Sequence, residues 1–388
     1  MAFSPPNSPQ AENPLARLSD EELEQIGREF DAIHDEVFAS LGDKDSEYIR
    51  NVIALQRQLA LLARAILLGS RYKPAWLLGT GVLGIAKILE NMEIGHNVMH
   101  GQWDWMQDPQ INSTSWDWDS ASTKEAWKHS HNYVHHTFTN IRGKDKDLGY
   151  EIMRIDPRQE WKPVYLLQPF YNVFLAAFFE WGVALHDLDV EAFFDGEKTK
   201  KEVLHDLKGM RHKAWRQIAK DYIAFPALSG PKGFLPTLTA NFTANIIRNV
   251  WAYAIIFCGH FPDQCYTFSE EETENETKAG FYVRQLLGAA NIEGSPIFHV
   301  LSGNLGYQVE HHIFPDMPSS RYAQVAPKVK EICERHKLPY NSGRFGKQLW
   351  MVQRTIAKLA FPGGRVPKKP GPYEPVEDDA IVRPLIAV

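Results

Sequence analysis

The sequence has few cysteines, three in 388 residues, at Cys258, Cys265 and Cys333. They form neither a C-x-x-C pair nor an even set. This argues against a disulfide framework and against a thiolate metal or iron–sulfur site. Cysteine usage therefore favours a reducing, intracellular setting.

An excess of basic residues is also lacking, since 42 Lys and Arg face 48 Asp and Glu, for a formal net charge of −6. This balance argues against a partner bound through phosphate neutralisation, so we expect no nucleic acid. The polar, Pro-rich start, MAFSPPNSPQAENP, has neither the basic nor the apolar region of a secretory signal. A mean hydropathy of −0.35 describes a soluble protein on average, but the distribution of residues is uneven.

Apolar residues gather in four internal stretches, at residues 52–69, 75–89, 164–185 and 222–257. We expect helices in the first two. The third is long enough for a hydrocarbon core of about 30 Å, but polar segments flank it, and we expect it to lie along a membrane interface. The fourth is interrupted by SGPKG, which predicts a helical hairpin whose second arm ends near Cys258. The segment before this fourth stretch is rich in Lys and Arg, which favours its placement on the cytoplasmic face of the membrane.

The two ends of the chain differ from this middle part. Residues 1–14 are expected to be disordered, and Ser19 with Glu22 predicts a capping box that opens an amphipathic helix to about Leu41. We divide the chain into a segment 1–50, a main domain 51–345, and an extension 346–388 with a loose tail after Pro362.

Histidine is abundant, with 15 residues, and much of it falls in three short motifs: HNVMH at 96–100, HSHNYVHH at 129–136 and QVEHH at 308–312. Residues four apart share a helix face, so the first two motifs can each present two imidazoles to one point. Seven such histidines exceed the three or four ligands of one zinc ion, and imidazole also suits iron. Asn97 stands where a zinc protease of the HExxH type has Glu. A two-metal site is the economical interpretation.

The motifs, as GHNVMHG, HNYVHHTFTN and YQVEHHIFPDMPSSRY, resemble those of the membrane fatty acid desaturase family, and in particular its bacterial acyl-CoA and acyl-lipid branch. The resemblance covers roughly residues 50 to 340. It implies an all-α fold, namely an integral membrane four-helix bundle with a cytosolic helical cap that holds a non-haem di-iron centre. It also implies a bacterial inner membrane, with the cap on the cytoplasmic side.

The resemblance implies a set of metal ligands from the motifs: His96, His100, His131, His135, His136, His311 and His312. Two further candidates are His260, after the last apolar arm, and His186, at the end of the interfacial stretch. Gln308 stands where some relatives have His, and it could ligate weakly, through water, or not at all. Acidic residues near the motifs are candidates to orient the ligands, with helix-surface charge as the alternative: Glu90, Glu93, Asp145 and Asp147.

The implied activity is an O₂-dependent desaturation that introduces a cis double bond into a long-chain acyl-CoA or acyl-lipid, leaning to the Δ9 position. A fatty acyl hydroxylase on the same scaffold is the nearest alternative, and a bis-His haem electron-transfer protein is a second. Neither an HPGG haem motif nor a Gly-rich dinucleotide motif occurs in the sequence. We therefore expect a separate electron donor, a ferredoxin, rubredoxin or cytochrome b5-like carrier with an NAD(P)H reductase.

Two other groups of residues have open roles. The two W-D-W triplets, at 103–105 and 116–118, and Trp127 could line an acyl channel or form an aromatic belt at a membrane interface. A basic cluster could meet a CoA or phospholipid phosphate, or the surface of membrane lipid: Lys198, Lys200, Lys201, Lys208, Arg211 and Lys213.

Overall fold

A computed structural model describes residue 15, residues 18–196 and residues 198–365 of the chain. The start expected to be disordered, residues 1–14, and most of the tail expected to be loose lie outside these residues. Within them the chain is mostly helical, and the strands β1 (Asn291–Glu293) and β2 (Ser342–Arg344) pair in parallel. The predicted all-α class is confirmed.

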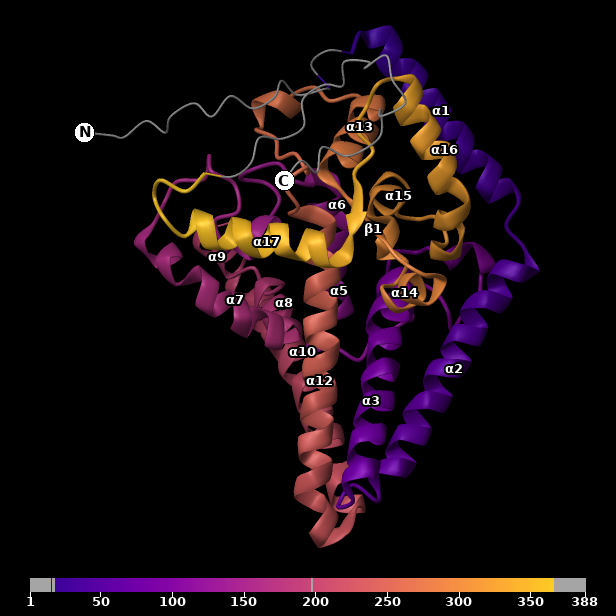
Figure 1. Cartoon of the computed structure of the whole chain (residues 1–388), viewed down its shortest axis with the longest axis vertical. Coiled ribbons are helices and arrows are strands. Elements are labelled where there is room, and N and C mark those ends of the chain that lie inside the picture. The colour runs from indigo at the N-terminus through magenta and orange to yellow at the C-terminus, as the bar shows by residue number, and fades with distance from the viewer. Residues whose placement is uncertain (1–14, 16–17, 197, 366–388) are drawn as a thin grey trace.

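The first two apolar stretches form a helical hairpin. α2 (Asp43–Leu67) and α3 (Lys73–Leu89) run side by side and meet at their lower ends in Figure 1. Pro74 occupies the first turn of α3. Backbone N–H groups in a first turn have no partner within the helix, so the missing N–H of proline costs no hydrogen bond there. The helix continues without a break into a π-helical segment, Glu90–His96, so it carries the chain directly to the first histidine motif.

A second hairpin packs against the first, and its first arm begins earlier than the sequence predicts. That arm consists of α10 (Lys200–Ile218), the π-helical segment Ala219–Ala224 and α11 (Phe225–Leu228). The prediction from residue 222 was wrong, because a capping box opens α10 and the helical arm continues through the π-helical segment and past Pro226 to the end of α11. The basic cluster, apart from Lys198, therefore lies on the arm itself. The returning arm, α12 (Gly230–His260), ends two residues after the predicted Cys258.

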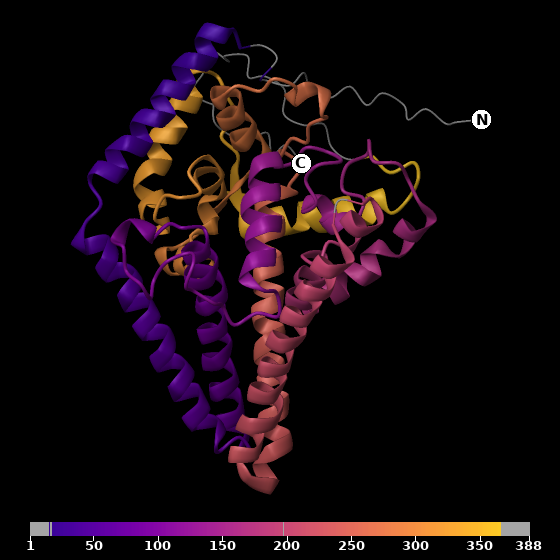
Figure 2. The same ribbon diagram turned by 180° about the vertical axis from the view of Figure 1, so that it is seen from behind.

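The long helices converge at one end of the molecule, as Figure 2 shows from behind. Of the helices in the part of the chain that the structure describes, none is both long enough and apolar enough to cross a membrane.

The third apolar stretch is divided. It contains a 3-10 turn, Pro163–Leu167, followed by α7 (Gln168–Ala177) and α8 (Phe179–His186), with a break at Phe178. One face of α7 is exposed and apolar, at Phe170, Val173 and Phe174.

Shorter helices gather around the upper ends of the long ones (Figure 1). They are α4 (Asn97–Met99), α5 (Lys124–Trp127), α6 (His136–Phe138), α9 (Val190–Phe194), α13 (Lys278–Gly288), α14 (Pro296–Leu301), α15 (Gln308–Ile313), α16 (Tyr322–Arg335) and α17 (Phe345–Leu359).

The predicted capping box is confirmed: Ser19 and Glu22 cap α1 (Asp20–Ala39). α1 packs against α13 and α16, and its Phe30 is fully buried in one core with Val309 of α15. The N-terminal helix thus covers the elements that carry the third histidine motif.

Candidate metal centre

Parts of the first two histidine motifs lie on π-helical turns, while His100 follows α4 and His136 begins α6. His96 ends the segment Glu90–His96, and His131 and His135 lie within a second π-helical segment, Lys128–His135. Such turns occur often at functional sites. The predicted sharing of a face still holds, since the rings of His131 and His135 stack with centroids 5.1 Å apart.

The fold brings eight of the nine predicted histidines into one buried cluster. Their ring nitrogens form three groups, each with ligand atoms within 4.8 Å of one another: His96, His100, His131 and His311; His135, His260 and His312; and His136, His311 and His312. His260 comes from the end of α12, and His311 and His312 come from α15. Segments more than 200 residues apart therefore present imidazoles to one point.

Hydrogen bonds to the outer ring nitrogen orient several of these imidazoles. The Nδ1 of His135 lies 3.0 Å from Asp145 Oδ1, and that of His131 lies 3.3 Å from Asp147 Oδ2. Both aspartates thus contact the outer nitrogen of a predicted ligand, and their role in orienting metal ligands stays a prediction. A carboxylate that accepts from Nδ1 fixes the tautomer and turns Nε2 inward, as around metal ions.

Gln285 and Tyr322 contact the outer nitrogens of two more imidazoles. The Nδ1 of His312 donates to Gln285 Oε1 at 2.9 Å, and the Nδ1 of His311 lies 3.2 Å from Tyr322 Oη. Gln285 lies on α13, so nothing in the sequence near the motifs indicates its role. Tyr322, in contrast, is the last residue of the third motif, so its position in the sequence marks it as a candidate partner.

Several inward nitrogens are buried without a hydrogen-bond partner in the described part of the chain: Nε2 of His100, His131 and His135, and both ring nitrogens of His136. Orphaned polar atoms are costly in a protein interior unless an unseen group satisfies them. A metal cation, which accepts lone pairs from imidazole nitrogens, would satisfy them.

Electrostatics agree with a cation at this place. Burial, reinforced by the neighbouring imidazoles, holds the pKa of each of five histidines well below its usual range: His96, His100, His136, His311 and His312. Burial also disfavours a charge on His135, but Asp145 and Asp147 outweigh it and raise that pKa. Neutral imidazole is the form that binds metal.

Distances between ring nitrogens fit shared ions as well. His260 Nε2 lies 3.2 Å from His312 Nε2, and His96 Nε2 lies 3.4 Å from His311 Nε2. Two nitrogens bound at about 2.1 Å to one tetrahedral cation stand about 3.4 Å apart. The residues present therefore fit a histidine-bound metal centre.

Comparison with known proteins agrees with this geometry. The model of the family described as "Fatty acid desaturase" matches residues 74–344 of the chain. The chain belongs to this family. It is 46% identical to the "NADPH-dependent stearoyl-CoA 9-desaturase" of Mycobacterium tuberculosis, over 90% of this chain and 82% of that protein. It is 25% identical to the "sn-1 linoleoyl-lipid 6-desaturase" of Synechocystis, over 77% of this chain and 84% of that protein.

The ninth predicted histidine of this desaturase lies apart. His186 Nε2 is 3.1 Å from the carbonyl oxygen of Lys146 and 3.8 Å from Asp147 Oδ1. Burial alone would lower its pKa, but the hydrogen bond with Asp187 and the charge of Asp147 raise the pKa of His186 to about 9. His186 is therefore placed beside an orienting aspartate, and its role as a ligand stays a prediction.

Gln308 and two of the predicted orienting residues also make other contacts. Gln308 Nε2 lies 3.0 Å from His260 Nε2, so its amide contacts a clustered imidazole. Glu93 accepts from Tyr48, Ser319 and Asn304, and Glu90 accepts from the backbone N–H of Asp119. Glu93 is fully buried, whereas Glu90 is half-buried.

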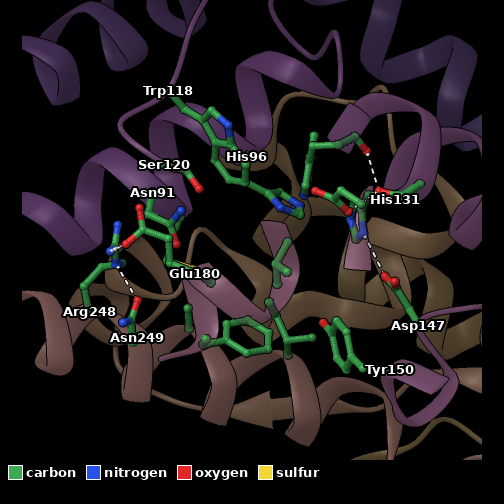
Figure 3. Close-up of a pocket in the computed structure, with 18 residues that line it drawn as sticks. Asn91, His96, Trp118, Ser120, His131, Asp147, Tyr150, Glu180, Arg248 and Asn249 are labelled. Carbon is green, nitrogen blue, oxygen red and sulfur yellow. Dashed lines mark hydrogen bonds and ion pairs between the residues drawn. The ribbon is translucent and has the colours of Figure 1, made fainter. Parts of the chain in front are cut away.

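An enclosed cavity of about 50 Å³ runs beneath the cluster of this desaturase. Figure 3 shows it passing from Arg248 and Glu180 at one end, under His96, to His131 and Tyr150 at the other. Its apolar lining comes chiefly from Met92, Trp118, Trp127, Phe179, Val183 and Ile256.

The tryptophans proposed for an acyl channel have different places. Trp127 and Trp118 both line the cavity, and Trp127 stacks on His131 with centroids 4.7 Å apart. Trp103 is fully buried in another core with Tyr48. The second W-D-W triplet therefore contributes to the cavity through Trp118, whereas Trp103 stabilises the fold.

Proposed function

We propose that this fatty acid desaturase introduces a cis double bond at the Δ9 position of a long-chain acyl-CoA, with O₂ as co-substrate. The observation that carries the proposal is the extent of identity with the mycobacterial stearoyl-CoA 9-desaturase. The eight clustered histidines supply the chemistry that such a reaction needs.

Two iron ions are the proposed cofactors, held by His96, His100, His131, His135, His136, His260, His311 and His312. When bound and reduced, they supply the activation of O₂ for removal of hydrogen from two adjacent methylene groups. The protein's part is to position the acyl chain and exclude water. Phe179 and Ile256 give the cavity beside His96 and His131 apolar walls, which supports such positioning.

Electrons are proposed to come from a separate carrier, a ferredoxin, rubredoxin or cytochrome b5-like protein with an NAD(P)H reductase. The name of the mycobacterial relative includes NADPH dependence, which supports a nicotinamide source.

We also propose that the converging ends of the long helices insert into a bacterial inner membrane and that the histidine end faces the cytoplasm. Exposed leucines at these ends support insertion: Leu61, Leu62, Leu77, Leu78, Leu228 and Leu235. An apolar surface of this extent on a single protein marks a membrane or partner contact. The basic cluster on α10 supports the cytoplasmic side.

Product analysis tests the function. Expression in a host with a defined fatty-acid profile should yield a new Δ9 double bond, located by gas chromatography and mass spectrometry, and His135→Ala should yield none. A hydroxylated acyl product would favour the hydroxylase instead. A Soret band without non-haem iron would favour the bis-His haem protein.

A further inference from the structure

The outer ring nitrogen of His260 lacks the kind of partner that several other clustered imidazoles have. Its Nε2 faces the cluster, 3.2 Å from His312 Nε2 and 3.0 Å from Gln308 Nε2. Its Nδ1 is buried and has no hydrogen-bond partner among the described residues. A histidine that binds metal through one nitrogen almost always donates from the other to a carboxylate, a carbonyl or a water molecule. His260 therefore needs such an acceptor on its outer side.

A small enclosed cavity lies against His260, apart from the cavity beside His96 and His131. Its volume is about 30 Å³, and its other walls come from the turn after α12, from residues 155–157 and from Thr267 and Thr355. No other clustered histidine lines it, so it lies on the outer side of the His260 ring. About 10–15 Å³ of such space already holds one water molecule, and the cavity therefore has room for one.

Asp263 brings a second unpartnered polar atom to this cavity. It stands three residues after His260, and both residues line the cavity. Its Oδ1 is buried and has no hydrogen-bond partner in the part of the chain that the structure describes. A water molecule between the two residues would accept a hydrogen bond from His260 Nδ1 and donate one to the Asp263 carboxylate. Buried waters occur in cavities that offer two or more such partners.

The C-terminal helix α17 holds this carboxylate in place. Arg354 of α17 pairs through Nη2 with Asp263 Oδ2, and α17 crosses the upper end of α12 in Figure 1. The Nε of Arg354 is also buried without a partner within the described residues. A carboxylate oxygen can accept two hydrogen bonds, so Oδ1 has capacity for both Nε and a water. Arg354 lies beyond residues 74–344, which the family model matches.

We propose that Asp263, fixed by Arg354, positions the metal ligand His260 through one buried water molecule. The water keeps the proton of His260 on Nδ1 and leaves the lone pair of Nε2 to the metal. Asp263 is then a positioning residue, since it acts through His260 and touches neither substrate nor metal. The inference rests on the proposed function, because it takes His260 to be an iron ligand.

The iron affinity of purified full-length variants, measured by competition with a chelator, tests the role of Asp263. Asp263→Ala should bind iron about tenfold more weakly, at the lower end of the usual effect of losing such a partner. Asp108→Ala is the matched control and should bind iron as the wild type does. The side chains of Asp108 and Asp263 are 13% and 16% exposed, and each pairs with one arginine. Equal iron affinity of Asp263→Ala and the wild type overturns the proposal.

A double-mutant cycle distinguishes positioning from a general loss of stability. His260→Ala should weaken iron binding, and adding Asp263→Ala to it should cause no further loss, because the imidazole on which Asp263 acts is gone. A further loss of the same size as in the wild-type background would overturn the proposal, since Asp263 would then act without His260. If His260→Ala binds iron as tightly as the wild type, His260 is no ligand and the proposal fails with that assignment. Formation of the Δ9 product by the wild-type preparation shows separately whether the proposed function stands.

A density map of the iron-loaded, full-length enzyme, at a resolution that shows water molecules, tests the bridge directly and needs no variant. We expect one water within hydrogen-bond distance, about 2.7–3.2 Å, of both His260 Nδ1 and Asp263 Oδ1. An empty cavity, or a direct hydrogen bond between His260 and Asp263, would contradict the contact through water.

Discussion

At the scale of single residues, the centre depends on which nitrogen of each imidazole faces inward. His135 is held by Asp145 on one side and has an unpartnered, buried Nε2 on the other, with partners sought throughout the described residues. Replacing His135 with Ala should therefore lower the iron content, because one ion loses a ligand. His129, exposed and stacked on Tyr133, provides the control: His129→Ala should retain iron. Metal analysis of both purified variants checks this, and equal iron in the two would contradict the assignment.

Asp145 allows a finer test of orientation. It accepts hydrogen bonds from His135 Nδ1 and from the backbone N–H groups of Asn140 and Asp147. Asp145→Asn keeps the size but turns an amide NH₂ towards one of these donors. We expect iron affinity to fall about 10- to 100-fold, the usual effect of losing such a partner. Competition with a chelator measures it, and Asp195→Asn, at an exposed site after α9, should leave the affinity unchanged.

The sequence predicts ligands better than their partners. His96 and His100 are recognisable because their spacing is local, and Asp145 because it lies close to the second motif. Gln285 reaches His312 only through the packing of α13 against α15, and no local pattern reports such packing. Glu93 lies near the first motif along the chain, yet its side chain bonds Tyr48, Ser319 and Asn304 instead of a histidine.

At the scale of elements, the π-helical turn before His96 depends on a glycine. A Cβ added at Gly95 would lie 2.9 Å from the carbonyl oxygen of Glu90 and 3.0 Å from Trp118 Cβ. Gly95→Ala should therefore shift this turn and reduce both iron content and thermal stability. Gly81→Ala on α3 is the control, since a Cβ there meets nothing within 4 Å and Ala is the better helix former by about 1 kcal/mol. Unchanged iron in Gly95→Ala would show that the turn tolerates a side chain.

α1 offers a test of packing. Phe30 is fully buried against Tyr282 and Phe314, so Phe30→Ala should cost about 3–5 kcal/mol of unfolding free energy. Because α1 covers α13 and α16, which carry Gln285 and Tyr322, the variant should also release iron faster. Denaturant unfolding and chelator kinetics measure the two effects, with Glu21→Ala at an exposed site as the control. If Phe30→Ala is destabilised but releases iron at the normal rate, the packing of α1 does not affect iron binding at the centre.

At the scale of the whole molecule, apolar runs predict the helices at residues 52–69 and 75–89 because they stand out against polar neighbours. The first arm of the second hairpin escapes such a prediction, since α10 is rich in Lys and Arg and hydropathy cannot distinguish a charged helix from a charged loop. The meeting of three distant motifs was expected from the resemblance.

The convergence of exposed leucines at one end of the molecule gives a prediction for the whole chain. Leu235 on α12 is 65% exposed. If this end inserts into a membrane, Leu235→Lys should disfavour insertion by about 3 kcal/mol near the bilayer centre. The variant should then pass partly into the supernatant when membranes are washed with alkaline carbonate, whereas the wild type stays in the pellet. Gln25→Lys, exposed on α1 at the opposite end, should behave as the wild type. Equal retention of Leu235→Lys and the wild type would contradict insertion through this end.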